Sequence, residues 1–259
     1  MIIEAVTLGL LIGVVIGMLG GGGAILTVPV LVYALGQDVH TATTTSLLVV
    51  ALASGVGAWG QARHECVCWK HTSAFAPTAL AGTVAGTALN QLVGATALLL
   101  LFAGLMLAAA LATWNNGAAA TEGVIGTQCP PVQRTRVILA GLGVGFLTGF
   151  LGVGGGFVIV PVLAVLLAMP MRGAIGTSLS IVTIVSACGL AAHLVSGSTI
   201  DFGIAVPLAA GCIAGAVAGP QFGRRVSAQH LAHGFAALLI LVAGYVLIAT
   251  AISGGAPGA

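Results

Sequence analysis

Long apolar stretches separated by short polar ones run through the whole sequence. Two further apolar segments are interrupted by glycines, at 20–23 and 152–156, and each precedes a group of three uninterrupted stretches. A helix that crosses a bilayer core of roughly 30 Å needs about 20 apolar residues. Six stretches meet this length: 43–61, 72–93, 95–113, 173–195, 202–221 and 230–252. The pattern predicts an all-α polytopic membrane protein.

The two glycine segments are copies of one sequence. GMLGGGGAILTVPVL at 17–31 aligns without gaps with GFLGVGGGFVIVPVL at 149–163, which is an offset of 132 residues. The same offset aligns HTATTTSL at 40–47 with RGAIGTSL at 172–179. A transmembrane unit is therefore duplicated over nearly the whole chain. The repeat predicts three parts: a first transmembrane repeat at 1–113, a linker loop at 114–135 and a second transmembrane repeat at 136–259.

The positive charges distinguish between two topologies. If each glycine segment crossed the membrane once, the seven Lys and Arg residues would divide four against three between the two sides. If each segment folds back as a hairpin, all seven fall on one side, as expected for residues that favour the cytoplasm. Three full spans then remain in each half, so the halves must be inverted. We therefore expect two inverted repeats, each a glycine-broken helix or hairpin plus three transmembrane helices, with both termini outside and the linker inside.

Composition excludes several classes of protein. Hydrophobic residues make up 59% of the 259 positions and charged residues only 5%, whereas a soluble domain carries roughly 25% charged residues. The net charge of +2 comes from dispersed residues and does not indicate a nucleic-acid surface. The sequence predicts a multi-pass protein of the cell membrane whose surroundings are the lipid bilayer.

The glycine breaks are candidates for a substrate site. Glycine permits a positive φ at a hairpin tip, and unpaired backbone is tolerated at membrane depth only inside protein or beside a polar cavity. Helix N-termini at such breaks attract anions, and broken helices that meet at the midplane recur in secondary transporters. The candidate substrate-binding residues are Gly20, Gly22, Gly23, Thr45, Ser46, Gly152, Gly154, Gly155, Thr177 and Ser178.

Two simpler interpretations stay open for these residues. Glycines at four-residue spacing permit close helix packing, as we expect for Gly141, Gly145 and Gly149. Serine and threonine hydroxyls in membrane helices often bond back to their own backbone. The repetition of the breaks beside identical Thr-Ser pairs favours the site.

His40 and Arg172 occupy equivalent positions in the two repeats, each at the start of the helix that carries the Thr-Ser pair. A cation there opposes the helix dipole, so stability alone does not explain the placement. A positive group at each mouth would raise the local concentration of anions. The alternative is that Arg172 only marks the cytoplasmic boundary.

The twin G-x-L-G-x-G-G breaks, each closing on V-P-V-L and followed by A-x-x-T-S-L, resemble the sulfite exporter TauE/SafE family of membrane proteins over essentially the whole chain. The resemblance implies a secondary transporter of a small sulfur-containing anion or organosulfur compound, of the sulfite, sulfoacetate or thiosulfate type. The copies differ where Gly21 meets Val153 and where Ala24 meets Gly156, so the two tips are expected to differ in shape.

Other functions are less consistent with the residues. An anion channel is the main alternative, although a channel usually shows a continuous ring of like polar residues. An intramembrane hydrolase would need a base near Ser178, but His193 lies 15 residues on, roughly 22 Å along a helix. We expect no enzyme activity, no catalytic residue and no cofactor. A coupling proton or ion and the oligomeric state are left open.

One cluster of metal-ligand residue types lies between the predicted spans 43–61 and 72–93 of the first repeat. The stretch HECVCWKH holds His64, Cys66, Cys68 and His71. Its C-x-C spacing is tighter than the C-x2-C of structural zinc sites. We therefore interpret it as a polar loop and expect no metal.

Overall fold

The computed structural model describes residues 2–21, 23–37, 39–64, 66–90, 95–116, 133–151, 156–167, 169–195 and 199–252. Its described part consists of helices and contains no strand. The first half comprises α1 (Ile2–Leu19), α2 (Ala24–Pro29), the π-helical turn η1 (Val30–Ala34), α3 (Val39–Ala62), α4 (Trp69–Asn90) and α5 (Ala95–Asn116). The second half comprises α6 (Arg134–Leu151), α7 (Gly156–Pro161), η2 (Val162–Leu166), α8 (Met171–Val195), α9 (Phe202–Arg225) and α10 (Ala228–Ile252).

The element bounds repeat along the chain. Adding 132 to the bounds of α1, α2 and η1 gives those of α6, α7 and η2, and the other three pairs agree closely. The six predicted spans correspond to α3, α4, α5, α8, α9 and α10. Within the described residues, five helices are long and apolar enough to cross a membrane: Ile2–Leu19, Thr41–Ala62, Met171–Val195, Phe202–Gln221 and Gln229–Ile248. The prediction of an all-α polytopic membrane protein is confirmed.

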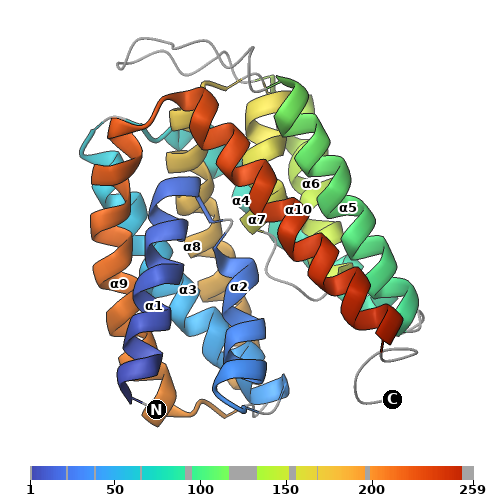
Figure 1. Ribbon diagram of the computed structural model, residues 1–259. Coiled ribbons are helices and arrows are strands. Elements are labelled where there is room, and N and C mark those ends of the chain that lie inside the picture. Colours follow the sequence, from blue (N-terminus) through green and yellow to red (C-terminus); the bar gives the residue numbers. More distant parts are fainter. Residues whose placement is uncertain are drawn as a thin grey trace.

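The first glycine segment reverses the direction of the chain. In Figure 1, α1 runs away from the end of the molecule that holds the N-terminus, and α2 returns toward that end. The returning arm contains Pro29 and ends in a π-helical turn, where the Leu35 N–H bonds to the Val30 carbonyl. The two arms therefore form a hairpin within the bundle, although α1 is by itself long and apolar enough to cross a membrane.

Two pairs of helices pack with their backbones in contact. A Cβ on Gly13 of α1 would collide with the backbone of Cys212 on α9, and one on Gly17 would lie 2.9 Å from the Ala216 carbonyl. Since the numbers of the contacting residues rise together along the two helices, α1 and α9 run parallel. Close approach of this kind maximises van der Waals contact, which drives helix association where the surroundings are apolar.

The second pair, α4 with α6, repeats this arrangement. A Cβ on Gly145 would collide with the backbone of Ala79, and one on Gly149 with that of Thr83. The expectation that the glycines of α6 permit close packing is confirmed. In both pairs, the first helix of one half packs against a later helix of the other half, so the two halves are interlocked.

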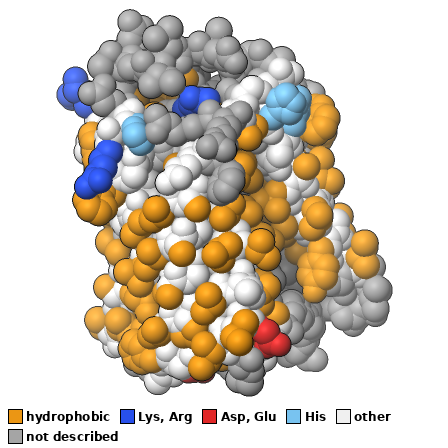
Figure 2. Space-filling view, turned by 60° about the vertical axis from the view of Figure 1, so that its left-hand side comes forward, with side chains coloured by type: hydrophobic (Ala, Val, Ile, Leu, Met, Phe, Trp, Pro, Cys, Tyr) orange, Lys and Arg blue, Asp and Glu red, His pale blue; other side chains and the backbone are white. Residues whose placement is uncertain are grey.

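Basic and acidic side chains lie toward opposite ends of the helices. Arg63 and Lys70 flank the α3–α4 connection, Arg134 and Arg136 open α6, and Arg172 is the second residue of α8. Figure 2 shows the Lys and Arg side chains of one face near one end of the molecule, acidic side chains near the other, and a broad hydrophobic band between them.

Aromatic residues mark the same end. The Arg63 guanidinium lies 4.2 Å from the ring centroid of Trp59, and the exposed fractions of Trp59 and Trp69 are 63% and 61%. Tryptophan collects at membrane–water interfaces. We call this the basic end, defined by Arg63, Lys70, Arg134, Arg136 and Arg172.

Candidate substrate site

The first glycine break depends on two left-handed residues. Gly20 has φ +75° and Gly21 has φ +98°, a region that costs other L-residues roughly 1–2 kcal/mol. The use of glycine for a positive φ is therefore found at these two positions. Gly23 belongs to the same predicted tip, but the expectation of a positive φ is wrong there, because this residue has φ −67° and is the N-cap of α2. Gly23 is needed for space instead, since a Cβ there would lie 2.7 Å from the Ile16 side chain.

Gly156, the described residue of the second glycine segment, lies against the first break. A Cβ on Gly156, at the start of α7, would lie 2.8 Å from the Gly21 carbonyl oxygen. Val182 of α8 packs beside both glycines, and a Cβ on Gly20 would lie 2.7 Å from the Cα of Ile175. Segments from the two halves thus meet in a buried region beside α8. Gly22, Gly152, Gly154 and Gly155 lie outside the described residues.

The two predicted serines are bonded to backbone carbonyls. Ser178 donates its hydroxyl to the Gly20 carbonyl at 2.7 Å, which ties α8 to the first break across 158 residues of sequence. Ser46 donates to the Thr43 carbonyl of its own helix at 2.8 Å. A hydroxyl has one hydrogen to donate, so in this arrangement neither serine can also donate to an anion. Their geometry supports a structural role.

The two predicted threonines keep their donors. Thr177 accepts a hydrogen bond from the Cys68 N–H at 3.0 Å, which leaves its own hydrogen available. The Thr45 hydroxyl is buried without a hydrogen-bond partner. Both side chains have exposed fractions of 0%. Because an unpaired buried hydroxyl is costly, this equivalent pair is suited to bind a polar ligand.

Sequence reasoning missed a further hydroxyl near the first break. Thr27, on α2, is fully buried and its Oγ1 atom has no hydrogen-bond partner. Its position in the second copy is occupied by Ile159. The only sequence signal for Thr27 was a single polar residue in an apolar segment, and the second copy has no polar residue at the equivalent position.

The remaining predicted residues lie at helix starts or outside the centre. Arg172 is half-buried at the basic end, and His40 is the second residue of α3, with its side chain outside the described part. His64 is exposed whereas His71 is buried. Among the described residues, no three His, Cys, Asp or Glu side chains are grouped to hold a metal ion.

We expect removal of the two threonine hydroxyls to weaken the binding of an anion. Thr45→Val removes a donor with little change in shape, and a hydrogen bond to a charged group contributes about 1.5–3 kcal/mol. If these hydroxyls bind an anion, its apparent affinity in a binding assay should therefore fall roughly ten- to a hundredfold. Thr177→Val should act similarly, although it also leaves the Cys68 N–H unpaired.

Thr183→Val is the matched control for these variants. Thr183 lies on α8 and donates to the Leu179 carbonyl of its own helix at 2.8 Å. Its loss should leave affinity unchanged. Unaltered affinity in the Thr45 and Thr177 variants, at equal abundance, would assign both hydroxyls to helix packing.

Comparison with known proteins identifies relatives over almost the whole chain. The sequence profile described as "Sulfite exporter TauE/SafE" matches residues 5–246. A "Probable membrane transporter protein" of Xylella fastidiosa strain 9a5c is 32% identical over 249 residues, covering 92% of each chain. The "Probable membrane transporter protein YdhB" of Bacillus subtilis strain 168 is 26% identical over 212 residues, covering 82% of this chain and 86% of its own. No solved structure matches.

These matches agree with the helical fold and the apolar spans described above. They extend across both halves, including the two glycine breaks and the helices that follow them. The chain belongs to the sulfite exporter TauE/SafE family, and it is a multi-pass membrane transporter of the cell membrane, not an enzyme.

Proposed function

We propose that this transporter moves a small sulfur-containing anion, of the sulfite, sulfoacetate or thiosulfate type, past the point where the two glycine breaks meet. The observation that supports this proposal most directly is the contact of Gly21 with Gly156 beside α8, the helix that also holds Thr177. Family membership supports the sulfur chemistry. An oxyanion fits a site that offers hydroxyl donors in an otherwise apolar interior.

The charge distribution supports an anionic substrate. Two acidic residues lie within the described part of the chain, and one of them, Glu4, is in the first turn of α1. Asp201 caps the start of α9, where its carboxylate accepts a hydrogen bond from the Gly203 N–H at 2.9 Å. No acidic side chain therefore stands beside the breaks among the described residues, so an anion there would meet no repulsion from a carboxylate.

The substrate class is tested by uptake into proteoliposomes. Sulfite, thiosulfate, sulfoacetate and chloride would be offered in parallel, at mildly alkaline pH so that sulfite stays anionic. We expect saturable, protein-dependent flux of one or more sulfur-containing anions and none of chloride. Equal flux of chloride would favour an unselective anion channel, and the absence of flux for every sulfur-containing anion would contradict the proposal.

We also propose that the two halves are inverted relative to each other in the membrane. Three observations support this: the common offset of 132 residues, the parallel pairs that join helices of different halves, and the gathering of Lys and Arg at the basic end. The basic end would then face the cytoplasm. A broken helix would enter from each side, as in other secondary transporters.

Cysteine labelling checks this topology. In a background without the five native cysteines, Ala34→Cys reports on the turn after the first hairpin and Thr121→Cys on the linker. Ala34 is exposed at the end of η1. A membrane-impermeant maleimide should label the first from outside and the second only after permeabilisation. Labelling of both from the same side would contradict the hairpin and the inversion.

A further inference from the structure

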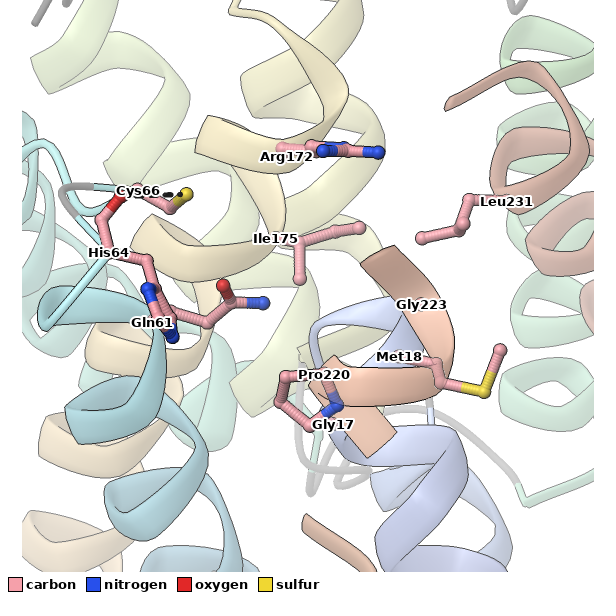
Figure 3. A pocket seen from close by; sticks show the side chains of 10 residues that line it. All are labelled: Gly17, Met18, Gln61, His64, Cys66, Arg172, Ile175, Pro220, Gly223 and Leu231. Atoms are coloured by element: carbon pink, nitrogen blue, oxygen red, sulfur yellow. Dashed lines mark hydrogen bonds between the residues drawn. The ribbon is translucent and has the colours of Figure 1, made fainter. Parts of the chain in front are cut away.

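A pocket at the basic end lies next to the first glycine break, on the side of the break that faces the basic end. The ends of α1, α3 and α9 meet the beginnings of α8 and α10 around it. Figure 3 shows ten residues that line it: Gly17, Met18, Gln61, His64, Cys66, Arg172, Ile175, Pro220, Gly223 and Leu231. Helices of both halves contribute, so the pocket exists only because the two halves are interlocked.

The walls of the pocket suit a small oxyanion. Arg172 extends across the upper part, while Gln61 and His64 lie together on one side (Figure 3). A guanidinium offers a planar set of donors that matches oxyanions, and the amide of Gln61 adds further donors. Met18, Pro220 and Leu231 close the other side with apolar surface. None of the ten described residues that line the pocket is acidic.

The floor of the pocket is in contact with the break. Ile175 lines the pocket, and its Cα is the atom that a Cβ on Gly20 would approach to 2.7 Å. Gly17, another lining residue, precedes that break by three positions. Ser178, one turn beyond Ile175 on α8, donates its hydroxyl to the Gly20 carbonyl at 2.7 Å. The packing of Ile175 on Gly20 and the hydrogen bond from Ser178 therefore lie between the pocket and the break.

We infer that this pocket is an entrance chamber that binds a small oxyanion from the basic end, with Arg172 as the main anion-binding residue and Ile175 as the barrier to the glycine breaks. The inference rests on the proposed function, because it places a second binding position on the path of the same anion. It assigns Gln61, a residue that no repeat motif includes, to selection of the anion.

Direct binding to purified protein in detergent tests the chamber independently of transport. Sulfite and sulfoacetate are the probes, titrated by calorimetry into wild type and Arg172→Gln. We expect the variant to bind roughly ten- to a hundredfold more weakly, since it loses charged hydrogen bonds to the anion. Arg172→Lys should recover part of the affinity, because it restores the charge without the planar fork. Gln61→Leu, which keeps the guanidinium, should weaken binding by a smaller factor.

Arg63→Gln is the matched control. Arg63 lies at the same basic end but stacks on the exposed ring of Trp59 and does not line the pocket. It should bind both probes as wild type does. If Arg172→Gln and Arg63→Gln weaken binding equally, the effect belongs to the general field of the basic end and the chamber is contradicted.

Two further outcomes separate the possible failures. Wild type that transports sulfite, with an Arg172→Gln variant that binds it equally well, would overturn the chamber and leave the proposed function intact. Wild type that neither binds nor transports any probe would overturn both. Added phosphatidylglycerol should not displace the probes, and displacement would assign the pocket to lipid headgroups instead.

Discussion

Gly21→Val is expected to abolish anion flux. Gly21 has φ +98°, and a Cβ there would lie 3.2 Å from Val182 and 3.4 Å from the Gly156 carbonyl oxygen. Valine adds its branched bulk to this contact and must also adopt a backbone conformation that costs about 1–3 kcal/mol. The two breaks would be forced apart at their point of contact. Flux per molecule of reconstituted protein, measured with the preferred sulfur-containing anion, should fall to the level of empty liposomes.

Gly36 provides the control for backbone strain. Its φ is +65°, but a Cβ there would meet no atom within 4 Å. Gly36→Ala and Gly21→Ala therefore impose similar strain, and only the second adds atoms where the breaks meet. We expect transport to survive the first and to be strongly reduced by the second. Equal flux in the two alanine variants would show that the contact between the breaks is not needed for transport.

Gly145→Val should cause the largest loss of folded protein. Any side chain at Gly145 would enter the backbone of Ala79 on α4, and a backbone cannot move aside as a flexible side chain can. Overpacking typically costs about 1–3 kcal/mol in cores that can adjust, so we expect at least that loss here. The yield of monodisperse protein after detergent extraction, and its apparent Tm, should both drop.

Gly143→Val tests whether this effect comes from packing or from helix propensity. Gly143 lies on the same helix and is exposed, and a Cβ there would meet no atom within 4 Å. The same substitution there changes intrinsic helix propensity by a few tenths of a kcal/mol without any collision. Near-wild-type yield for Gly143→Val and low yield for Gly145→Val support the close pairing of α4 with α6. Equal yields would contradict it.

Much of the fold could be predicted because a bilayer imposes strong constraints on sequence. The span expected at 43–61 is α3 (Val39–Ala62), and the span expected at 173–195 is α8 (Met171–Val195). Length and hydropathy define such helices without knowledge of their partners. The duplication also predicted the interruptions after α1 and α6, since similar glycine runs recur at the same offset.

The details of the site depended on contacts between distant residues. The sequence could not distinguish Gly20 and Gly21, which adopt positive φ, from Gly23, which does not. Glycine has no side chain that would signal its conformation. Likewise, the hydroxyls of Thr177 and Ser178 are adjacent in sequence and differ only in their partners. Those partners lie on other segments, so only the folded structure separates donor-bearing threonines from carbonyl-bound serines.

The same geometry bears on the choice between a carrier and a channel. Ile175 packs against Gly20, and the Ser178 hydroxyl holds the Gly20 carbonyl from the same helix. A continuous pore would need an open path lined by polar groups, whereas on our proposal this packed contact closes the route between the basic-end pocket and the breaks. Alternating exposure of a central site accounts for both the closed contact and the paired breaks.

Counterflow in proteoliposomes tests this account most directly. Vesicles loaded with a high concentration of unlabelled sulfite, and diluted into a trace of ³⁵S-sulfite, would be sampled over time. A carrier exchanges one anion for another, so labelled sulfite should transiently accumulate above its equilibrium level and then decline. The overshoot should disappear with Gly21→Val and persist with Gly36→Ala. A simple approach of wild type to equilibrium, without an overshoot, would contradict transport of sulfite by alternating access at the glycine breaks.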